Sequence, residues 1–359
     1  MNNNRIYNIK SIQILRSIAA LSVVYAHYSN YAFPQFATGA YGVDIFFIIS
    51  GFIIAYIVSG NKEQFLIKRI IRVVPLYVIA TGISIQVSLC SPHWVNNTSI
   101  SITAVVKSLL FIPYKVNNSG PILSLGWSLN YEMFFYFTMF ICIVLVRNKK
   151  YLSIACSLFL IILTILLNFL HTDNFIIHFY QKGLFPEFIF GIVLFHFYPY
   201  FSVRNKSSSS ATGINIFYTT LLSLIAVFSI VFLSLSCIYH WHISSNSNIQ
   251  VGIPALILIT AFLSLEKKIN GNNILIKLSL LLGDASYVMY LFHPFCIFFL
   301  QRIIFPALGI QHNGLIVELL KLFISLSLTA IASVYLYKFM DNPIQIYLRK
   351  ILLNKKRSK

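Results

Sequence analysis

The 359-residue chain is unusually apolar, because hydrophobic residues make up 58% of it and charged residues 10%. Soluble domains carry about 25% charged residues, and the mean hydropathy here is +0.78, so the composition excludes an ordinary soluble protein. The net charge of +18 could indicate a nucleic-acid partner, but the basic residues cluster between apolar runs. We therefore predict an all-α, polytopic integral membrane protein that binds no nucleic acid.

Ten apolar runs are long enough to cross a bilayer, which takes roughly 17 to 25 residues of helix. If the N-terminus is cytoplasmic, 21 of the 27 basic residues fall in cytoplasmic segments and four in external ones. This asymmetry follows the positive-inside rule and predicts that both termini are cytoplasmic. We expect a single membrane domain over 1–359, with spans near 11–30, 41–59, 73–90, 127–146, 151–171, 184–201, 214–238, 249–265, 284–304 and 315–337.

The first span contains two polar side chains, Arg16 and His27, which are eleven positions apart. Eleven steps of 100° make three turns plus roughly 20°, so both side chains project from one helix face, about 16 Å apart. A cation inside a membrane helix costs at least about 2.5 kcal/mol and usually lines a protein interior or an aqueous path. We predict a functional face here, although a lone membrane histidine also serves to hydrogen-bond helices together.

The second span begins with an acid, Asp44, and carries Ser50 and Gly51 farther along. If the first two helices are antiparallel, Asp44 lies at the same external level as His27. A carboxylate beside an imidazole would orient the ring and stabilise its protonated form. Gly51 more simply permits close helix packing.

A basic cluster precedes the third span and consists of Lys68, Arg69 and Arg72. Arg69 and Arg72 are three positions apart and therefore share a helix face. One interpretation is an anchor on lipid phosphates at the cytoplasmic surface. The other is a forked-donor site for a phosphorylated cytoplasmic ligand.

Two acids lie inside apolar runs near the external boundary, Glu132 in the fourth span and Glu187 in the sixth. Trp127 lies where aromatic belts form, and Tyr131 is close to it in sequence. A membrane-embedded carboxylate is costly. Each acid is expected either to hydrogen-bond a neighbouring helix or to help position a hydroxyl-bearing acceptor.

The remaining polar residues of the spans receive structural interpretations. We expect His293 to be structural, Asp284 to cap the N-terminus of the ninth span, and Glu318 to pair with Lys321 three positions on. The five cysteines have no C-x-x-C spacing, and His240-Trp-His242 lacks further ligands. No metal site is predicted.

Six short motifs follow one another between residues 11 and 349. They are a basic residue and a histidine with ten residues between them (Arg16 and His27), a phenylalanine-rich stretch ending in Ser-Gly-Phe (46–52), Arg-x-x-Arg before a proline (69–72), Trp-Ser-Leu-Asn-Tyr-Glu (127–132), a Gly-Asp-Ala-Ser-Tyr stretch ending in histidine (283–293), and a closing Asp-Asn-Pro (341–343). In these motifs the chain resembles the acyltransferase 3 family, bacterial integral-membrane O-acyltransferases that modify polysaccharides. It is similar to stand-alone members without an appended esterase-like domain. Asp341 departs from the Glu-x-Pro more usual in the family.

The resemblance implies O-acylation, most often O-acetylation, of a hydroxyl on a cell-surface or lipid-linked polysaccharide. His27 would be the general base, or alternatively would carry the acyl group covalently. Arg16 would lie along the path of the thioester arm. The implied catalytic set is His27, Arg16, Asp44 and Glu132.

The donor implied by the family is cytoplasmic acyl-coenzyme A, most often acetyl-coenzyme A, acting as a co-substrate rather than a permanently bound cofactor. Its phosphates would be held by Lys68, Arg69 and Arg72, together with Ser50 of the Ser-Gly-Phe motif, since guanidinium groups match phosphate geometry. The acceptor would contact Trp127, Tyr131 and Glu187.

The expected partners are therefore the lipid bilayer, acyl-coenzyme A and a glycan acceptor that can be polyprenyl-linked. The expected location is the bacterial inner membrane, in which the chain would be multi-pass. A glycan flippase, a polymerase or a transporter without acyl-transfer chemistry is the alternative that also suits ten spans with a basic cytoplasmic side.

Overall fold

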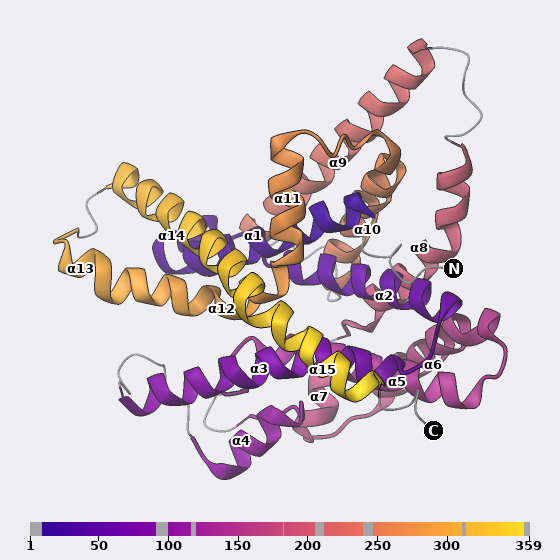
Figure 1. The fold of residues 1–359 in the computed structure, drawn as a ribbon, viewed down its shortest axis with the longest axis horizontal. Coiled ribbons are helices and arrows are strands. Elements are labelled where there is room, and N and C mark those ends of the chain that lie inside the picture. Colours follow the sequence, from indigo (N-terminus) through magenta and orange to yellow (C-terminus); the bar gives the residue numbers. More distant parts are fainter. Residues whose placement is uncertain are drawn as a thin grey trace. The chain divides into compact units, whose positions relative to one another are not determined.

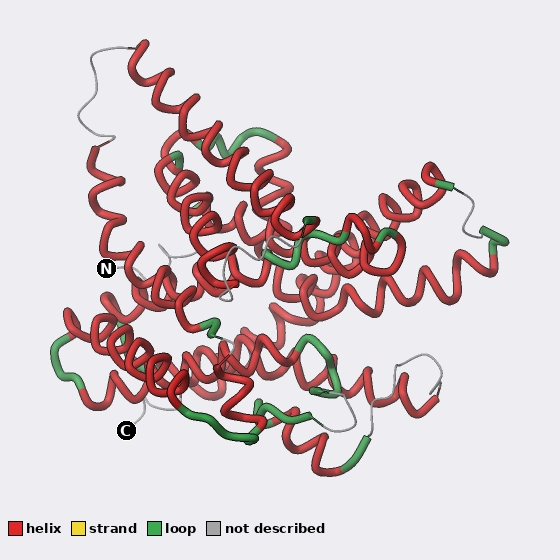
Figure 2. Tube along the Cα trace, turned by 180° about the vertical axis from the view of Figure 1, so that it is seen from behind, coloured by secondary structure: helices red, strands yellow, loops and turns green. Residues whose placement is uncertain are grey.

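The fold of the chain is given by a computed structural model that describes residues 9–90, 100–115, 120–181, 183–204, 212–239, 247–310 and 314–354. The predicted His240–His242 motif lies outside these residues. Within them, helix is the regular secondary structure and strands are absent, so the all-α prediction is confirmed for the described part (Figure 2).

The α-helices, labelled in Figure 1, are α1 (Lys10–Ala32), α2 (Gly42–Gly60), α3 (Phe65–Cys90), α4 (Ile102–Leu109), α5 (Gly126–Leu145), α6 (Lys149–Phe169), α7 (Phe175–Gln181), α8 (Phe185–Arg204), α9 (Thr212–Ile238), α10 (Ser247–Ser264), α11 (Ile274–Asp284), α12 (Ser286–Phe299), α13 (Phe305–Ala307), α14 (Leu315–Leu336) and α15 (Asn342–Asn354). Short 3-10 helices cover Pro34–Phe36 and Glu266–Lys268. Two π-helical segments, Leu300–Ile304 and Tyr337–Asp341, join α12 to α13 and α14 to α15.

Seven helical stretches of the described residues are long and apolar enough to cross a membrane: Gly42–Gly60, Phe65–Cys90, Gly126–Leu145, Lys149–Phe169, Phe217–Ile238, Ser286–Ala307 and Leu315–Leu353. The chain is therefore a multi-pass membrane protein. Helix α1 is long enough but is not among the seven, because residues such as Arg16 and His27 lower its hydropathy.

Three helix boundaries differ from the prediction. Helix α3 begins at Phe65, so the basic cluster lies in the helix rather than before it. The last predicted span continues as helix through α15 to Asn354, because the π-helical segment Tyr337–Asp341 carries the helix through Pro343. Asp284 is not an N-cap but the last residue of α11, a helix that the sequence pattern did not reveal.

The chain divides into two compact units, Met1–Ile53 with Phe190–Met340, and Ile54–Ile189 with Asp341–Lys359. We call them the α1 unit and the α3–α5 unit. In the α1 unit, α1 contacts α10, α11, α12 and α14, and Figure 1 shows α10 and α11 beside it. Helix α1 is therefore the helix around which this unit packs.

Glycines let the backbone of neighbouring segments approach α1 closely. A Cβ on Gly42 of α2 would lie 2.3 Å from the Ala19 carbonyl oxygen, and one on Gly283 of α11 would lie 2.2 Å from that of Gln13. Small residues at such contacts are the usual means of tight helix packing in membranes. A Cβ on Gly191 would likewise lie 2.9 Å from the Cα of Gly51, which agrees with the packing role expected for Gly51.

The N-terminus of α1 is capped by an acid from a distant segment. The Lys10 and Ser11 amides donate to the two carboxylate oxygens of Glu266, at 2.9 and 2.7 Å. A carboxylate there satisfies backbone N–H groups that have no helical partner and complements the positive end of the helix dipole. This contact fixes the start of the helix that carries Arg16 and His27.

In the α3–α5 unit, α3 and α5 pack antiparallel. The Tyr136 ring of α5 lies 6.4 Å from that of Phe65 at the start of α3, whereas Gly126 at the start of α5 approaches the Tyr77 hydroxyl. Helix α6 packs on α5, and α7 on α6. The register of α3 against α5 determines which polar residues of the two helices meet.

Candidate active site

Arg16 and His27 lie in the same helix, α1, as predicted. Arg16 is buried, and its Nη1 donates to Oε1 of the buried Gln13 at 3.4 Å. His27 is exposed. Eleven residues at 1.5 Å each separate them by about 16 Å along the axis, so one helix carries a buried cation and an accessible imidazole.

The hydrogen bond of His27 defines which ring nitrogen is available. Its Nδ1 lies 3.0 Å from the carbonyl oxygen of Val23, one turn earlier. A carbonyl can only accept, so Nδ1 must carry the hydrogen, and in the neutral ring Nε2 is then an acceptor. His27 therefore presents the lone pair that a general base requires.

The side chain that contacts the His27 ring is His293 of α12. The two ring centroids are 4.6 Å apart with 65° between the ring planes. His293 is completely buried, and its Nδ1 is bonded to the Met289 carbonyl at 3.2 Å. The sequence interpretation took His293 as structural and so missed this contact. Two signals were available: His293 is an ionisable residue within an apolar run, and it ends the motif over 283–293.

A buried ion pair in α14 contacts the C-terminal end of α1. Lys321 Nζ is 3.0 Å from Glu318 Oε1, which confirms the predicted pair. The Tyr28 hydroxyl, next to His27 in sequence, donates to Glu318 Oε2 at 3.2 Å. Lys321 also lies 5.5 Å from the centre of the Phe305 ring. This network links the end of α1 to α14 by polar contacts that are strong in a medium of low dielectric constant.

Helix α2 carries Asp44 and Ser50. Asp44 is half-buried in the first turn, where an anion is favoured by the helix dipole. It lies near Cys237 of α9. Ser50 is half-buried, next to the Gly51–Gly191 contact. The pairing of Asp44 with His27 and the donor role of Ser50 both stay predictions.

The three basic residues of α3 have different environments. Arg69 is buried, with 7% of its surface exposed, whereas Arg72 and Lys68 are half-buried. Lys68 Nζ donates to the backbone carbonyl of Glu63 at 2.9 Å, which directs it toward the start of the helix. A simple anchor on lipid headgroups would not bury a guanidinium, so Arg69 fits the forked-donor interpretation better.

Glu132 joins these arginines through a tyrosine. The Tyr136 hydroxyl donates to Glu132 Oε1, and the charges of Arg69 and Arg72 act on that hydroxyl. The prediction placed Glu132 near the external boundary and in the catalytic set with His27, and that role stays a prediction. The antiparallel register of α3 and α5 brings its partner Tyr136 to the start of α3. The structure therefore brings together Arg69, Arg72, Tyr136 and Glu132.

Tyr131 of α5 and Glu187 of α8 lie near each other. Glu187 is completely buried in the first turn of α8, and Tyr131 is buried as well. Their role toward an acceptor stays a prediction. The Tyr131 hydroxyl donates to the Phe179 carbonyl. Three rings pack against Tyr131, from Phe179, Tyr180 and Phe185. Phe134 packs against the last two of them. Trp127 is half-buried, one turn earlier in α5.

Comparison with known proteins identifies the family. The family model of the acyltransferase domain matches residues 9–338, which is most of the chain. The chain belongs to the acyltransferase 3 family. It is therefore a membrane acyltransferase that transfers groups other than amino-acyl groups, and its six motifs, taken together, indicated the family correctly.

Several relatives of this acyltransferase carry informative names. The exopolysaccharide production protein ExoZ of Rhizobium meliloti (strain 1021) is 32% identical over 73% of this chain and 78% of its own length. A protein of Staphylococcus aureus (strain COL) that is named as an O-acetyltransferase is 23% identical over 92% of this chain, but the chain spans only 56% of that relative. No solved structure matches the acyltransferase.

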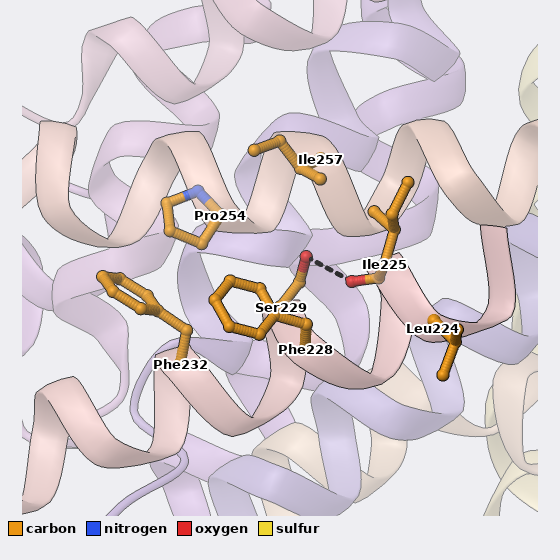
Figure 3. A pocket seen from close by; sticks show the side chains of 7 residues that line it. All are labelled: Leu224, Ile225, Phe228, Ser229, Phe232, Pro254 and Ile257. Atoms are coloured by element: carbon orange, nitrogen blue, oxygen red, sulfur yellow. Dashed lines mark hydrogen bonds between the residues drawn. The ribbon is translucent and has the colours of Figure 1, made fainter. Parts of the chain in front are cut away.

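Two pockets of the acyltransferase are lined by none of the predicted site residues. One, of about 420 Å³, lies between α9 and α10 (Figure 3). Its lining is apolar except for Ser229, whose hydroxyl donates to the Ile225 carbonyl at 2.8 Å. Such a lining suits a hydrocarbon chain rather than a polar substrate. The other, of about 590 Å³, is a polar surface pocket between α6 and α7.

Proposed function

We propose that this enzyme transfers an acyl group, most often acetyl, from cytoplasmic acyl-coenzyme A to a hydroxyl of a cell-surface or lipid-linked polysaccharide. The observation that carries the proposal is His27, an accessible imidazole whose Nδ1 is held by Val23 and whose Nε2 lone pair is available. The names of the relatives, which refer to exopolysaccharide production and to O-acetyltransferases, support the choice of acceptor and acyl group.

The proposal includes a topology. The seven apolar stretches together with α1, α8 and α10 would make ten spans. The protein would lie in the bacterial inner membrane, with both termini in the cytoplasm. The start of α3 would then face the cytoplasmic donor, and the end of α1, with His27, would face the external acceptor. Arg16 would lie between the two levels.

The chemical step follows from the state of His27. Its Nε2 takes the proton of the acceptor hydroxyl, and the oxygen attacks the thioester carbonyl carbon. The new ester C–O bond forms as the C–S bond breaks, and the proton held by His27 passes to the departing thiolate of coenzyme A. Holding the two substrates together supplies part of the rate enhancement, and general base catalysis contributes about 10²- to 10⁴-fold.

The donor site in this proposal is the arginine pair of α3. Arg69 and Arg72 each present a fork of N–H groups that can bind phosphate oxygens in pairs. Lys68 adds charge. The donor roles expected of Ser50 and Arg16, which belong to the α1 unit, stay predictions.

The remaining residues have roles that follow from their chemistry. Asp44 would orient His27. Glu132 would hold the Tyr136 hydroxyl beside the arginines. Trp127, which is half-buried, offers a ring face on which a sugar can stack. Tyr131 and Glu187 are buried and would shape the acceptor site from behind the surface.

The test is the ester content of surface polysaccharide, measured by mass spectrometry in cells that lack the gene, express it, or express His27→Ala. We expect esters only in cells with the wild-type enzyme. Equal ester content in all three would contradict the proposal. A flippase or transporter would change polysaccharide export and tolerate Arg69→Ala with Arg72→Ala, and a polymerase would change chain length at constant ester content.

A further inference from the structure

His293 has an unused hydrogen-bonding atom in a place where such atoms are costly. It is completely buried, its Nδ1 is engaged by the Met289 carbonyl, and its Nε2 has no hydrogen-bond partner. Because the carbonyl cannot donate, Nδ1 carries the hydrogen, and Nε2 of the neutral ring is a lone pair. A residue needed only for packing would fill this space with an apolar ring and avoid that cost.

His293 lies beside His27, the proposed base, and this position indicates a role in the reaction. Its ring lies 4.6 Å from the ring of His27, the imidazole that gains positive charge during acyl transfer. The ring centroid of Tyr290, also in α12, lies 6.2 Å from that of His293. The ring of Phe46 in α2 packs against Tyr290. His293 is thus a buried imidazole, electron-rich when neutral, packed against a ring that becomes charged in the proposed reaction.

We propose that His293 is a positioning residue for acyl transfer, a neutral imidazole that holds the His27 ring and stabilises the charge it acquires from the acceptor proton. The inference rests on the proposed function. His293 is not itself the base, because it is completely buried whereas His27 is exposed. The proton moves from the acceptor hydroxyl to His27 and then to the thiolate, and His293 neither gains nor loses one.

Two substitutions distinguish the effect of the Nε2 lone pair of His293 from the effect of side-chain packing. His293→Asn keeps an amide N–H near the position of Nδ1, and so keeps the bond to Met289, but has nothing in the place of Nε2. His293→Gln reaches the position of Nε2 with an amide oxygen, which is also an acceptor. The control is His196→Asn, an exposed histidine of α8 in the same unit.

The measurement is steady-state transfer to a polysaccharide acceptor by purified enzyme, with acetyl-coenzyme A as donor, together with the melting temperature of each variant. We expect His293→Asn to lower kcat by roughly 10- to 100-fold, the range found when partners that orient metal-binding histidines are replaced. We expect unchanged KM for both substrates, an unchanged melting temperature, and partial recovery of kcat in His293→Gln. The control should match the wild type.

Three results would overturn the inference: wild-type kcat in His293→Asn, a change confined to KM, or losses in both variants that only follow the loss of folded protein. The failure of the proposed function looks different. In that case the wild-type enzyme transfers no acetyl group and His27→Ala changes nothing, whereas failure of this inference alone leaves an active wild type and an inactive His27→Ala.

Discussion

Polar groups lie inside the membrane protein both around His27 in the α1 unit (the α1 region) and between α3 and α5 in the other unit (the α3–α5 region). The two regions differ in the kind of polar group they contain. Around His27 the groups near the exposed helix face are imidazoles, His27 and His293, each with its Nδ1 bonded to its own helix. Between α3 and α5 the groups are charged, two arginines near a tyrosine and a carboxylate. The first region suits proton transfer, and the second suits binding of an anion.

Under the proposed function, the first region would carry the chemistry and the second would bind the donor. An imidazole carries a charge only while it holds the transferred proton, whereas a guanidinium group remains charged throughout and suits the binding of an anion. Substitutions in the α1 region should therefore change kcat, and substitutions in the α3–α5 region should change the KM for the donor.

The largest effect should come from removal of the base. His27→Ala should lower kcat by about 10²- to 10⁴-fold because the acceptor hydroxyl loses its proton acceptor, at an unchanged KM for acetyl-coenzyme A. Acetyl transfer by the purified enzyme measures both constants, with His196→Ala as the control. Full activity of His27→Ala would place the chemistry elsewhere and remove the contrast between the regions.

The next effect concerns stability of the α1 region. Lys321→Met leaves Glu318 buried without its cation and should destabilise the fold by about 3–5 kcal/mol, seen as a lower melting temperature in detergent. Glu318→Gln combined with Lys321→Met should recover most of the loss, since no uncompensated charge remains. Equal melting temperatures for the single and double variants would mean that the ion pair does not hold this region.

A smaller effect is expected from the arginine pair. Arg69→Ala should raise the KM for acetyl-coenzyme A roughly 10- to 100-fold, because a hydrogen bond to a charged group contributes about 1.5–3 kcal/mol, and should leave kcat nearly unchanged. Lys149→Ala, an exposed basic residue of the same unit whose Nζ contacts the Gly60 carbonyl, is the control. A fall in kcat at constant KM would show that the α3–α5 region takes part in the chemistry.

The smallest effect should come from the cap on α1. Glu266→Ala leaves the Lys10 and Ser11 amides without their acceptor and should cost about 0.5–2 kcal/mol, with kcat preserved. Thermal unfolding measures the difference, and Glu63→Ala, an exposed acid of the other unit, should cost less. A large fall in kcat would instead connect the start of α1 to the reaction.

Much of the fold could be predicted from apolar runs of bilayer length. In such a run, the backbone N–H and C=O groups must bond to one another within the membrane, and a helix achieves this within a single segment. The pattern of apolar runs did not reveal α11, because its apolar segment of eleven residues is too short to cross a bilayer. The same pattern also predicted the start of the third span at residue 73. Charged residues such as Arg69 were excluded from the span, although the helix begins before them at Phe65.

The candidate site divides in the same way. Arg16 and His27 could be related from sequence because they share one helix, where spacing alone fixes the face. The meeting of Glu132 with the arginines depends on the register between α3 and α5, which no local pattern specifies. The contact of His293 with His27 likewise joins residues 266 positions apart.

The sequence by itself determined the membrane character, the family and the α1 face, because these depend on hydropathy, motif order and helical periodicity. Only the tertiary structure decided which side chains face one another: His293 against His27, Tyr28 against Glu318, and Tyr136 between Glu132 and the arginines. The physical reason is that helix formation is local, whereas the register of one helix on another is set by close contacts such as Gly283 on Gln13, which depend on both surfaces at once.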